Sequence, residues 1–304
     1  MKVALVGIGK IALDQHVPAI AASDHWELAA TVSRHGTVEG VEAFTDIQAM
    51  LDARPDIGTV SLCLPPVPRF EAAQAVLRAG RHLMLEKPPG ATLAEVRILR
   101  DLAAAQGVSI FATWHSRCAH GVAQAKAWLA NRVIREGRVI WREDVRKWHP
   151  GQDWIFEAGG MGVFDPGINA TSILTEILPM PIHLTSAQID VPANRQAPIA
   201  AQLQFSGNIH ADLDFREEGP QVWDMEFATD GGHLALRNGG NKLEIDGKTV
   251  TGDDQILGSE YANLYAQMAD LVRDGRSDVD LSPMVLVADA FTLAARRTVE
   301  DFEF

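Results

Sequence analysis

Two short motifs hold the residue types that alcohol oxidation requires. Lys87 follows an apolar run and precedes Pro88, and a lysine at such a turn can stabilise negative charge developing on a substrate oxygen. Asp165 and Asn169 are four residues apart, so on a helix they share one face and can hold a single ligand. A carboxylate can accept the proton of an alcohol while hydride leaves the adjacent carbon. Asp165, Lys87 and Asn169 are therefore the catalytic candidates. The alternative for Asp165 is a helix N-cap only, with Pro166 at the first helical position.

A second group of polar and aromatic residues follows Glu143. We expect a strand over Arg138–Arg146, in which period-two counting places Glu143 on an apolar side. A carboxylate on such a face needs polar partners, which a polyhydroxylated ligand supplies. Trp148 and His149 follow directly and add an aromatic plane and an imidazole, so this segment is typical of a sugar site. The alternatives are an ion pair between Glu143 and His149 and a core position for Trp148.

A glycine motif at the start of the chain predicts a dinucleotide site. It follows the apolar run Val3–Val6 and has the G-x-G-x-x-A form. The first glycine permits a tight turn, the second allows the backbone to approach the pyrophosphate, and the alanine allows close helix packing. The phosphates are expected at the helix N-terminus. The expected cofactor contacts in this motif are Gly7, Gly9, Lys10, Ile11 and Ala12.

The end of the second expected strand indicates which dinucleotide binds. An NAD enzyme usually has an acidic residue there for the ribose 2′-hydroxyl, but this strand, 28–32, ends in Ser33 and Arg34. A guanidinium with a neighbouring hydroxyl suits a 2′-phosphate. We therefore expect NADP, with NAD as the alternative. Pro65, Glu86 and Lys87, near the ends of later strands, complete the expected cofactor contacts.

The elements around these motifs predict a doubly wound α/β domain. Short apolar runs at 3–6, 28–32, 60–64, 83–85 and 108–112 alternate with helical segments at 69–79 and 93–106. Thr92 and Glu95 form a capping box for the second helix, and Gly80 suits a helix C-terminus. Such alternation is typical of a parallel sheet covered on both faces. We expect this Rossmann domain to span residues 1–118, and the Lys87–Pro88 peptide bond could be cis.

The remainder, residues 119–304, predicts an α+β domain with a large, mainly antiparallel open sheet. After helices at 122–129 and 165–178, the stretch 183–250 contains only strand-like segments separated by Gly, Asn and Pro, which is typical of an antiparallel meander. Two closing helices are expected at 261–273 and 283–297, the latter starting with Ser282 as cap and Pro283 as first helical residue.

Composition excludes several classes of protein. The net charge of −13 argues against a nucleic-acid partner, which needs a basic face. No apolar run is long enough for a membrane span, and the strand at the start of the sequence leads us to expect a cytoplasmic protein. Cys63 and Cys118 are too few for a disulfide framework or a zinc site, and no His, Asp or Glu set has familiar metal-ligand spacing.

Taken together, these motifs resemble the glucose–fructose oxidoreductase, inositol dehydrogenase and rhizopine catabolism superfamily over essentially the whole chain. The resemblance rests on the glycine motif, Glu86-Lys87-Pro88 and Asp165-x-x-x-Asn169. Longer strings look like the bacterial L-arabinose and D-galactose 1-dehydrogenases. These strings are at 9–16, 112–117, 143–152 and 162–170.

The resemblance implies an aldose 1-dehydrogenase that oxidises the anomeric carbon of L-arabinose or D-galactose to a lactone. It implies a sugar pocket lined by Lys87, Glu143, His149, Asp165 and Asn169, to which we add Trp148 and His115. Many members have His where Asn169 stands, and because Asn cannot titrate, Asp165 with Lys87 takes the role of base. The resemblance also implies a homodimer or higher oligomer. The alternatives are a dehydrogenase of another polyol, such as inositol or glucose, and a non-catalytic dinucleotide-binding sensor.

Overall fold

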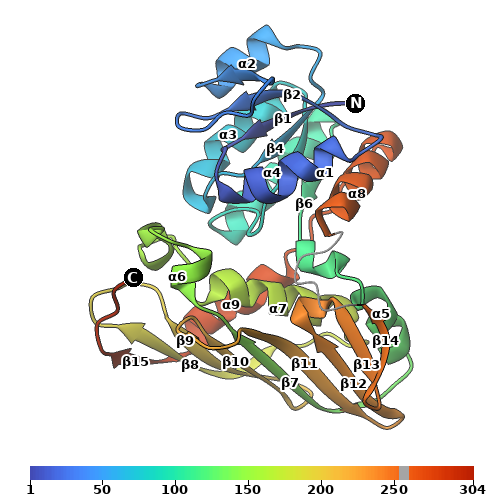
Figure 1. Cartoon of the computed structure of the whole chain (residues 1–304), viewed down its shortest axis with the longest axis vertical. Helices are drawn as coiled ribbons and strands as arrows, with labels where there is room; N and C mark the ends of the chain where they lie inside the picture. Colours follow the sequence, from blue (N-terminus) through green and yellow to red (C-terminus); the bar gives the residue numbers. More distant parts are fainter. Residues whose placement is uncertain (253–259) are drawn as a thin grey trace. The chain divides into compact units, whose positions relative to one another are not determined.

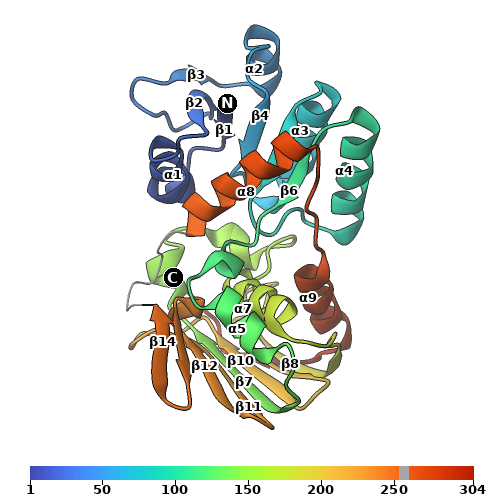
Figure 2. The same ribbon diagram turned by 90° about the vertical axis from the view of Figure 1, so that its right-hand side faces the viewer.

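The computed structural model describes residues 1–252 and 260–304 of the chain and divides them into two compact units. The first unit contains Met1–His115 and Tyr261–Asp280, and the second contains Ser116–Glu260 and Leu281–Phe304. The expected boundary after residue 118 does not include the return of residues 261–280 to the first unit. Figures 1 and 2 show the elements of each unit.

The first unit is built on a six-stranded sheet in the order β3-β2-β1-β4-β5-β6, and all its pairs are parallel. Apolar residues of these strands are buried on both faces, as expected for a parallel sheet. The chain reverses its winding direction between β1 and β4, where open α/β sheets bind ligands at their carboxyl ends. The strands are β1 (Lys2–Val6), β2 (Glu27–Val32), β3 (Glu42–Phe44), β4 (Thr59–Leu62), β5 (His82–Leu85) and β6 (Ile110–Ala112).

Helices cover this sheet, and one of them comes from far along the chain. Residues of α2 (Ile47–Ala53), α3 (Pro66–Arg78) and α4 (Leu93–Gln106) form one core with the strands. The helix after β1 begins with a π-helical turn, η1 (Ala12–His16), and continues as α1 (Val17–Ala21). Helix α8 (Glu260–Asp274) returns to this unit, and the Leu271 carbonyl accepts a hydrogen bond from Ser109 at 3.2 Å.

The second unit contains a nine-stranded sheet in the order β14-β13-β12-β11-β7-β10-β9-β8-β15. The pairs β7–β10 and β8–β15 are parallel and the others are antiparallel. The strands are β7 (Ile134–Arg142), β8 (Leu184–Pro192), β9 (Ala200–Phe205), β10 (Ile209–Asp214), β11 (Val222–Thr229), β12 (Gly232–Arg237), β13 (Lys242–Ile245), β14 (Lys248–Gly252) and β15 (Ala295–Val299).

Three helices of the second unit lie on one face of its sheet (Figure 1): α5 (Val122–Leu129), α7 (Phe164–Ile177) and α9 (Ser282–Leu293). Helix α7 packs against both neighbouring helices and against β7. Four short helices complete the described chain: η2 (His115–Cys118), α6 (Val145–Trp148), η3 (Asp153–Phe156) and η4 (Asn238–Gly240).

The structure confirms the predicted fold class and several local signals. The Thr92–Glu95 capping box is present, Gly80 has a positive φ of 68°, and the Lys87–Pro88 peptide bond is cis. No helix within the described ranges is long and apolar enough to cross a membrane.

Four predictions about local structure are wrong. The strand expected at 138–146 ends at Arg142, and Val145–Trp148 is helical, because the Asp144 side chain caps a helix there by accepting from the Arg146 N–H. The helix expected to reach 297 ends at Leu293, because the following residues pair with β8 as strand β15. Asp165 and Ser282 are not N-caps; the caps are Val163 and Leu281.

Candidate active site

The carboxyl ends of the parallel strands bring the expected cofactor residues of the first unit onto one edge of its sheet. Ser33 and Arg34 follow β2, the glycine motif follows β1, Pro65 follows β4 closely, and Glu86 and Lys87 follow β5. In the spatial order of the strands, these positions run from β2 through β1 and β4 to β5. This row is arranged as a dinucleotide would need, with the 2′-phosphate candidate at one end, the phosphate-binding turn next and Lys87 at the other end.

The glycine turn has the shape that a pyrophosphate site requires. Gly7 has a φ of 90°, and a Cβ there would lie 3.0 Å from the Leu64 backbone nitrogen, so only glycine fits without strain. A Cβ on Gly9 would meet no atom within 4 Å, which leaves space beside the backbone. Ala12 is fully buried, in agreement with close helix packing, whereas Lys10 forms an ion pair with Asp14.

The turn after β2 presents a cation. Ser33 Oγ accepts hydrogen bonds from the backbone N–H groups of His35 at 3.3 Å and Gly36 at 3.2 Å, which fixes the turn. The neighbouring Arg34 side chain is exposed and has no ion-pair partner within residues 1–252 and 260–304. Its guanidinium is therefore available to an anionic ligand, whereas Ser33 also has a structural role.

Glu86 lies in the interior behind the Lys87 turn. It is only 4% exposed, and its Oε1 lies 2.9 Å from His16 Nε2 and accepts a hydrogen bond from Tyr261 Oη at 2.9 Å. His115, expected in the sugar pocket, stacks on Tyr261 with 5.6 Å between ring centroids. Sequence reasoning missed the partnership of His16 and Tyr261 with Glu86, because 175 residues separate Tyr261 from Glu86 and no local pattern connects them.

The expected sugar-binding residues lie in the second unit on β7, α6 and α7. His149 Nε2 is 3.4 Å from Asp165 Oδ2, and the Asp165 side chain is largely buried in the first turn of α7. There the positive end of the helix dipole stabilises its negative charge. Asn169 follows one helical turn later and is half-buried. The structure thus brings His149 against Asp165, whereas sequence reasoning had considered an ion pair of His149 with Glu143.

Glu143 is the second buried carboxylate of this region. It is 7% exposed, and its Oε2 accepts a hydrogen bond from Trp223 Nε1 at 2.8 Å. The Glu143 backbone N–H still donates to the Asp214 carbonyl of β10 at 3.0 Å. Strand-like pairing therefore continues one residue past β7, and Glu143 is buried like Val139 and Trp141, as the period-two pattern predicts. Sequence reasoning missed Trp223, since only the pairing of β11 with β7 brings it beside this carboxylate.

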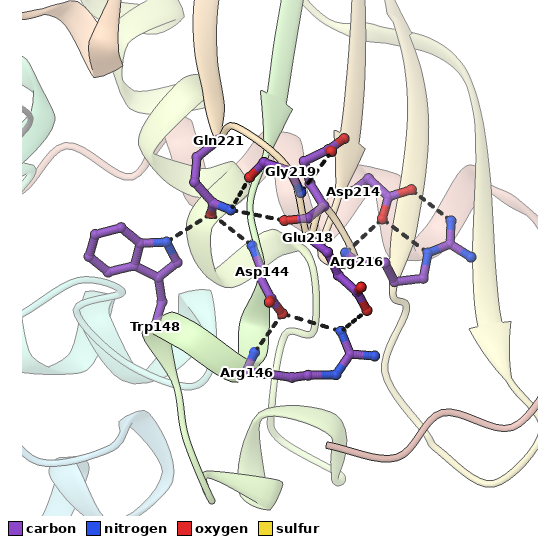
Figure 3. A network of polar contacts seen from close by, with 9 residues as sticks. Asp144, Arg146, Trp148, Asp214, Arg216, Glu218, Gly219 and Gln221 are labelled. Atoms are coloured by element: carbon purple, nitrogen blue, oxygen red, sulfur yellow. Dashed lines mark hydrogen bonds and ion pairs between the residues drawn. The ribbon is translucent and has the colours of Figure 1, made fainter.

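The loop between β10 and β11 fixes the orientation of Trp148 (Figure 3). The Trp148 indole N–H donates to Gln221 Oε1 at 2.9 Å, and the same oxygen accepts the Asp144 backbone N–H at 2.8 Å. Arg146 pairs with both Asp144 at 3.3 Å and Glu218 at 3.2 Å. Gln221 was not predicted from the sequence, because it is distant in sequence from the helix that it holds.

No group of three or more His, Cys, Asp or Glu side chains in the described ranges has the arrangement of a metal site. The first unit offers a phosphate-binding turn, a cation and a lysine. The second offers two buried carboxylates, an imidazole and an indole held in place by hydrogen bonds.

Burial of His16 and Glu86 makes the stability of the first unit depend on pH. Burial disfavours the charged imidazolium, but electrostatic interactions with Cys63 and Tyr265 and the Glu86 hydrogen bond raise the pKa of His16 well above 6.5. Burial likewise opposes ionisation of Glu86, yet the hydrogen bond and the charge of His16 lower its pKa from 4.5 to about 2. The pair is therefore ionised at neutral pH.

We predict that this ion pair stabilises the fold most between pH 4.5 and 6.5. The contribution of His16 is complete below its unfolded pKa of 6.5 and is lost as the pH rises through the folded pKa. That of Glu86 is complete above 4.5 and is lost as the pH falls towards 2. Thermal unfolding of the natural protein and of His16→Leu over a pH series should show the largest difference within this window. A difference that does not change with pH would contradict the ion pair.

Comparisons with known proteins agree with this arrangement. Residues 1–113 match the family described as an oxidoreductase family with an NAD-binding Rossmann fold. The chain is 41% identical over 308 aligned residues to the galactose 1-dehydrogenase of Pseudomonas fluorescens, covering 99% of this chain and 98% of that protein. The crystal structure of D-galactose-1-dehydrogenase from Rhizobium etli is 53% identical, with a TM-score of 0.94 over 99% of this chain and 97% of the other.

A more distant relative is the D-glucoside 3-dehydrogenase of Escherichia coli, 29% identical over 195 residues that make up 60% of this chain and 55% of that protein. The 3-ketoreductase KijD10 of Actinomadura kijaniata shares the fold at 20% identity, with a TM-score of 0.83 over 98% of this chain and 99% of that chain.

Proposed function

Because the chain belongs to the oxidoreductase family with the NAD-binding Rossmann fold, we propose that it is an aldose 1-dehydrogenase. Its substrates are the pyranose forms of D-galactose and L-arabinose, its product is the lactone, and NADP⁺ is its preferred hydride acceptor. The first unit binds the cofactor. The second binds the sugar and, through its open sheet, associates with further copies of the chain. This assignment places the protein in sugar catabolism.

The residues of the first unit fit a dinucleotide. The Gly7 turn leaves no room for a side chain, and the space beside Gly9 allows close backbone approach. Arg34 carries a positive charge with no partner in the described ranges, and it would hold the 2′-phosphate, with Lys10, Ile11, Ala12 and Pro65 as further contacts. When bound, the nicotinamide supplies the acceptor for the hydride of the sugar C1. Lys87, at the end of β5, stabilises negative charge on the reacting oxygen.

The residues of the second unit bind the sugar and remove its proton. Asp165 accepts the proton of the C1 hydroxyl, and His149, 3.4 Å from its Oδ2, orients the carboxylate. Glu143 binds a sugar hydroxyl while Trp223 holds its Oε2. Trp148 presents an apolar plane to the C–H face of the ring. Asn169 binds a hydroxyl because its amide can both donate and accept hydrogen bonds.

The observation that carries the proposal is the pair of buried carboxylates, Asp165 and Glu143. The His149 imidazole lies against Asp165, and the Trp223 indole N–H holds Glu143. An ionised carboxylate has several acceptor sites, so each of the two can accept hydrogen bonds from a polyhydroxylated ligand in addition to its ring partner. L-arabinose and D-galactose have the same pyranose stereochemistry and differ by a hydroxymethyl group. A pocket discriminates strongly against a missing hydroxyl that it binds but only weakly against an additional methylene. We therefore expect both sugars to be substrates of a pocket that does not bind the hydroxyl of the hydroxymethyl group.

Reduction of NADP⁺ and of NAD⁺ by a panel of aldoses and polyols tests this function. We expect turnover with D-galactose and L-arabinose and a lactone as the product. Turnover with inositol or glucose instead would assign a different polyol, and cofactor binding without turnover on any sugar would indicate a sensor.

Replacing Arg34 by Ala should distinguish the two cofactors. A charge-assisted contact to phosphate contributes about 1.5–3 kcal/mol, which corresponds to roughly a ten- to hundredfold change in affinity. The Michaelis constant for NADP⁺ should rise by this factor, and that for NAD⁺ should change little. Equal changes with the two cofactors would show that Arg34 does not bind the 2′-phosphate.

Replacing Asp165 by Asn should remove the base and preserve the fold. The amide has nearly the same shape, and because Asp165 is not the N-cap, the substitution removes a charge interaction with the helix dipole, about 0.3–1 kcal/mol, and weakens the contact with His149. Turnover of D-galactose should fall by roughly 10²–10⁴, with a nearly unchanged thermal midpoint. A folded variant with normal turnover would leave Asp165 with a structural role only.

A further inference from the structure

The Lys87 turn rests on a set of buried polar side chains, His16, Glu86, Tyr261 and Tyr265, which we name the His16–Glu86 network. Their exposed fractions are 0%, 4%, 3% and 1%. The proposed function gives none of them a part in accepting a proton or in binding a sugar hydroxyl. Buried polar groups are costly unless they are satisfied, so a network of four beneath a reactive residue needs an explanation.

Both carboxylate oxygens of Glu86 are engaged, and one of them holds Lys87. Oε2 accepts a hydrogen bond from the Lys87 backbone N–H at 2.9 Å. Oε1 accepts from Tyr261 Oη at 2.9 Å and lies 2.9 Å from His16 Nε2. His16 and Tyr261 therefore fix the plane of the carboxylate, and the carboxylate fixes the backbone from which the Lys87 side chain extends.

The charges of the pair strengthen this arrangement. The lowered pKa of Glu86 and the raised pKa of His16 keep both ionised near neutral pH, and a hydrogen bond to a carboxylate is roughly twice as strong as one to a neutral acceptor. The other nitrogen of His16, Nδ1, lies 2.8 Å from Tyr265 Oη. Tyr261 is thus connected to Lys87 through Glu86 alone, whereas Tyr265 is connected to Lys87 through His16 and then Glu86.

Arg69 also holds this turn. Arg69, 2% exposed on α3, donates from its guanidinium to the carbonyls of Glu86 and Pro88, on either side of Lys87. It also donates to the Leu64 carbonyl at 3.0 Å and so connects the ends of β4 and β5. The tyrosines of the network are the only two in the chain, and both lie on α8.

We propose that His16, Tyr261 and Glu86 are positioning residues that set the location of Lys87 at the cofactor edge of the sheet. The proposal rests on the proposed function for the role of Lys87. It assigns to the returning helix α8 a part in the chemistry of the first unit. Tyr265 contacts His16 at Nδ1, the ring nitrogen that does not face Glu86. It therefore supports His16 but does not bond to the carboxylate that holds the Lys87 backbone.

The test compares Tyr261→Phe with the matched control Tyr265→Phe. Each removes one buried hydroxyl that is bonded within the network, but only Tyr261 bonds directly to Glu86. Misplacement of a reacting group by about 1 Å can cost a hundredfold in rate, so Tyr261→Phe and His16→Leu should lower kcat for D-galactose by roughly ten- to a hundredfold. The Michaelis constant for NADP⁺ should change little, because the Gly7 turn and Arg34 are unaffected.

Two results separate positioning from stability alone. Tyr265→Phe should lower the thermal midpoint about as much as Tyr261→Phe and retain kcat. His16→Gln, whose amide can still donate towards Glu86, should recover part of the kcat lost in His16→Leu. Equal losses of kcat in the two tyrosine variants, or full kcat in both Tyr261→Phe and His16→Leu, would overturn the proposal.

A measurement without sugar distinguishes failure of this inference from failure of the proposed function. If the natural protein oxidises no aldose, the proposed function fails, but the fluorescence of bound NADPH still reports the surroundings of the nicotinamide. Tyr261→Phe and His16→Leu should then change this fluorescence, and Tyr265→Phe should not. Unchanged fluorescence in all three variants would overturn the positioning role.

Discussion

Parallel pairing of the first six strands is the constraint on which the arrangement of the first unit depends. Parallel strands all end at the same edge of a sheet, so residues that are distant in sequence are placed in a row without contacting one another. The spatial order β3-β2-β1-β4-β5-β6 then determines which function each strand end can have. A short loop after any strand is enough to present one group, and the sheet supplies the spacing between groups.

In the second unit, hydrogen bonds between side chains, rather than the ends of parallel strands, position the candidate residues. Its carboxylates are fixed by hydrogen bonds from large rings: Trp223 holds Glu143 and His149 lies against Asp165. Trp223 itself lies on strand β11, and the neighbouring Trp148 is held by Gln221 of the β10–β11 loop. An arrangement made this way depends on strand pairing over long sequence separations.

These two routes explain how much could be predicted from the sequence. The glycine motif, Arg34 and Lys87 lie directly after strands, so local periodicity was sufficient to place them on one edge. The Thr92–Glu95 capping box was likewise a local signal. In contrast, the partners of Glu86 and Glu143 come from elements far along the chain. Local signals also misled where tertiary pairing decided the outcome: the segment after Leu293 has helical composition but becomes a strand because it pairs with β8.

The return of helix α8 to the first unit has a consequence for biosynthesis. A ribosome releases the polypeptide from the N-terminus, and the first 115 residues contain all six strands of the parallel sheet. The buried His16 and Glu86 nevertheless lack their partners Tyr261 and Tyr265 until synthesis has passed residue 265. The first unit therefore acquires its full set of buried hydrogen-bond partners only after residues 261–280 have been made.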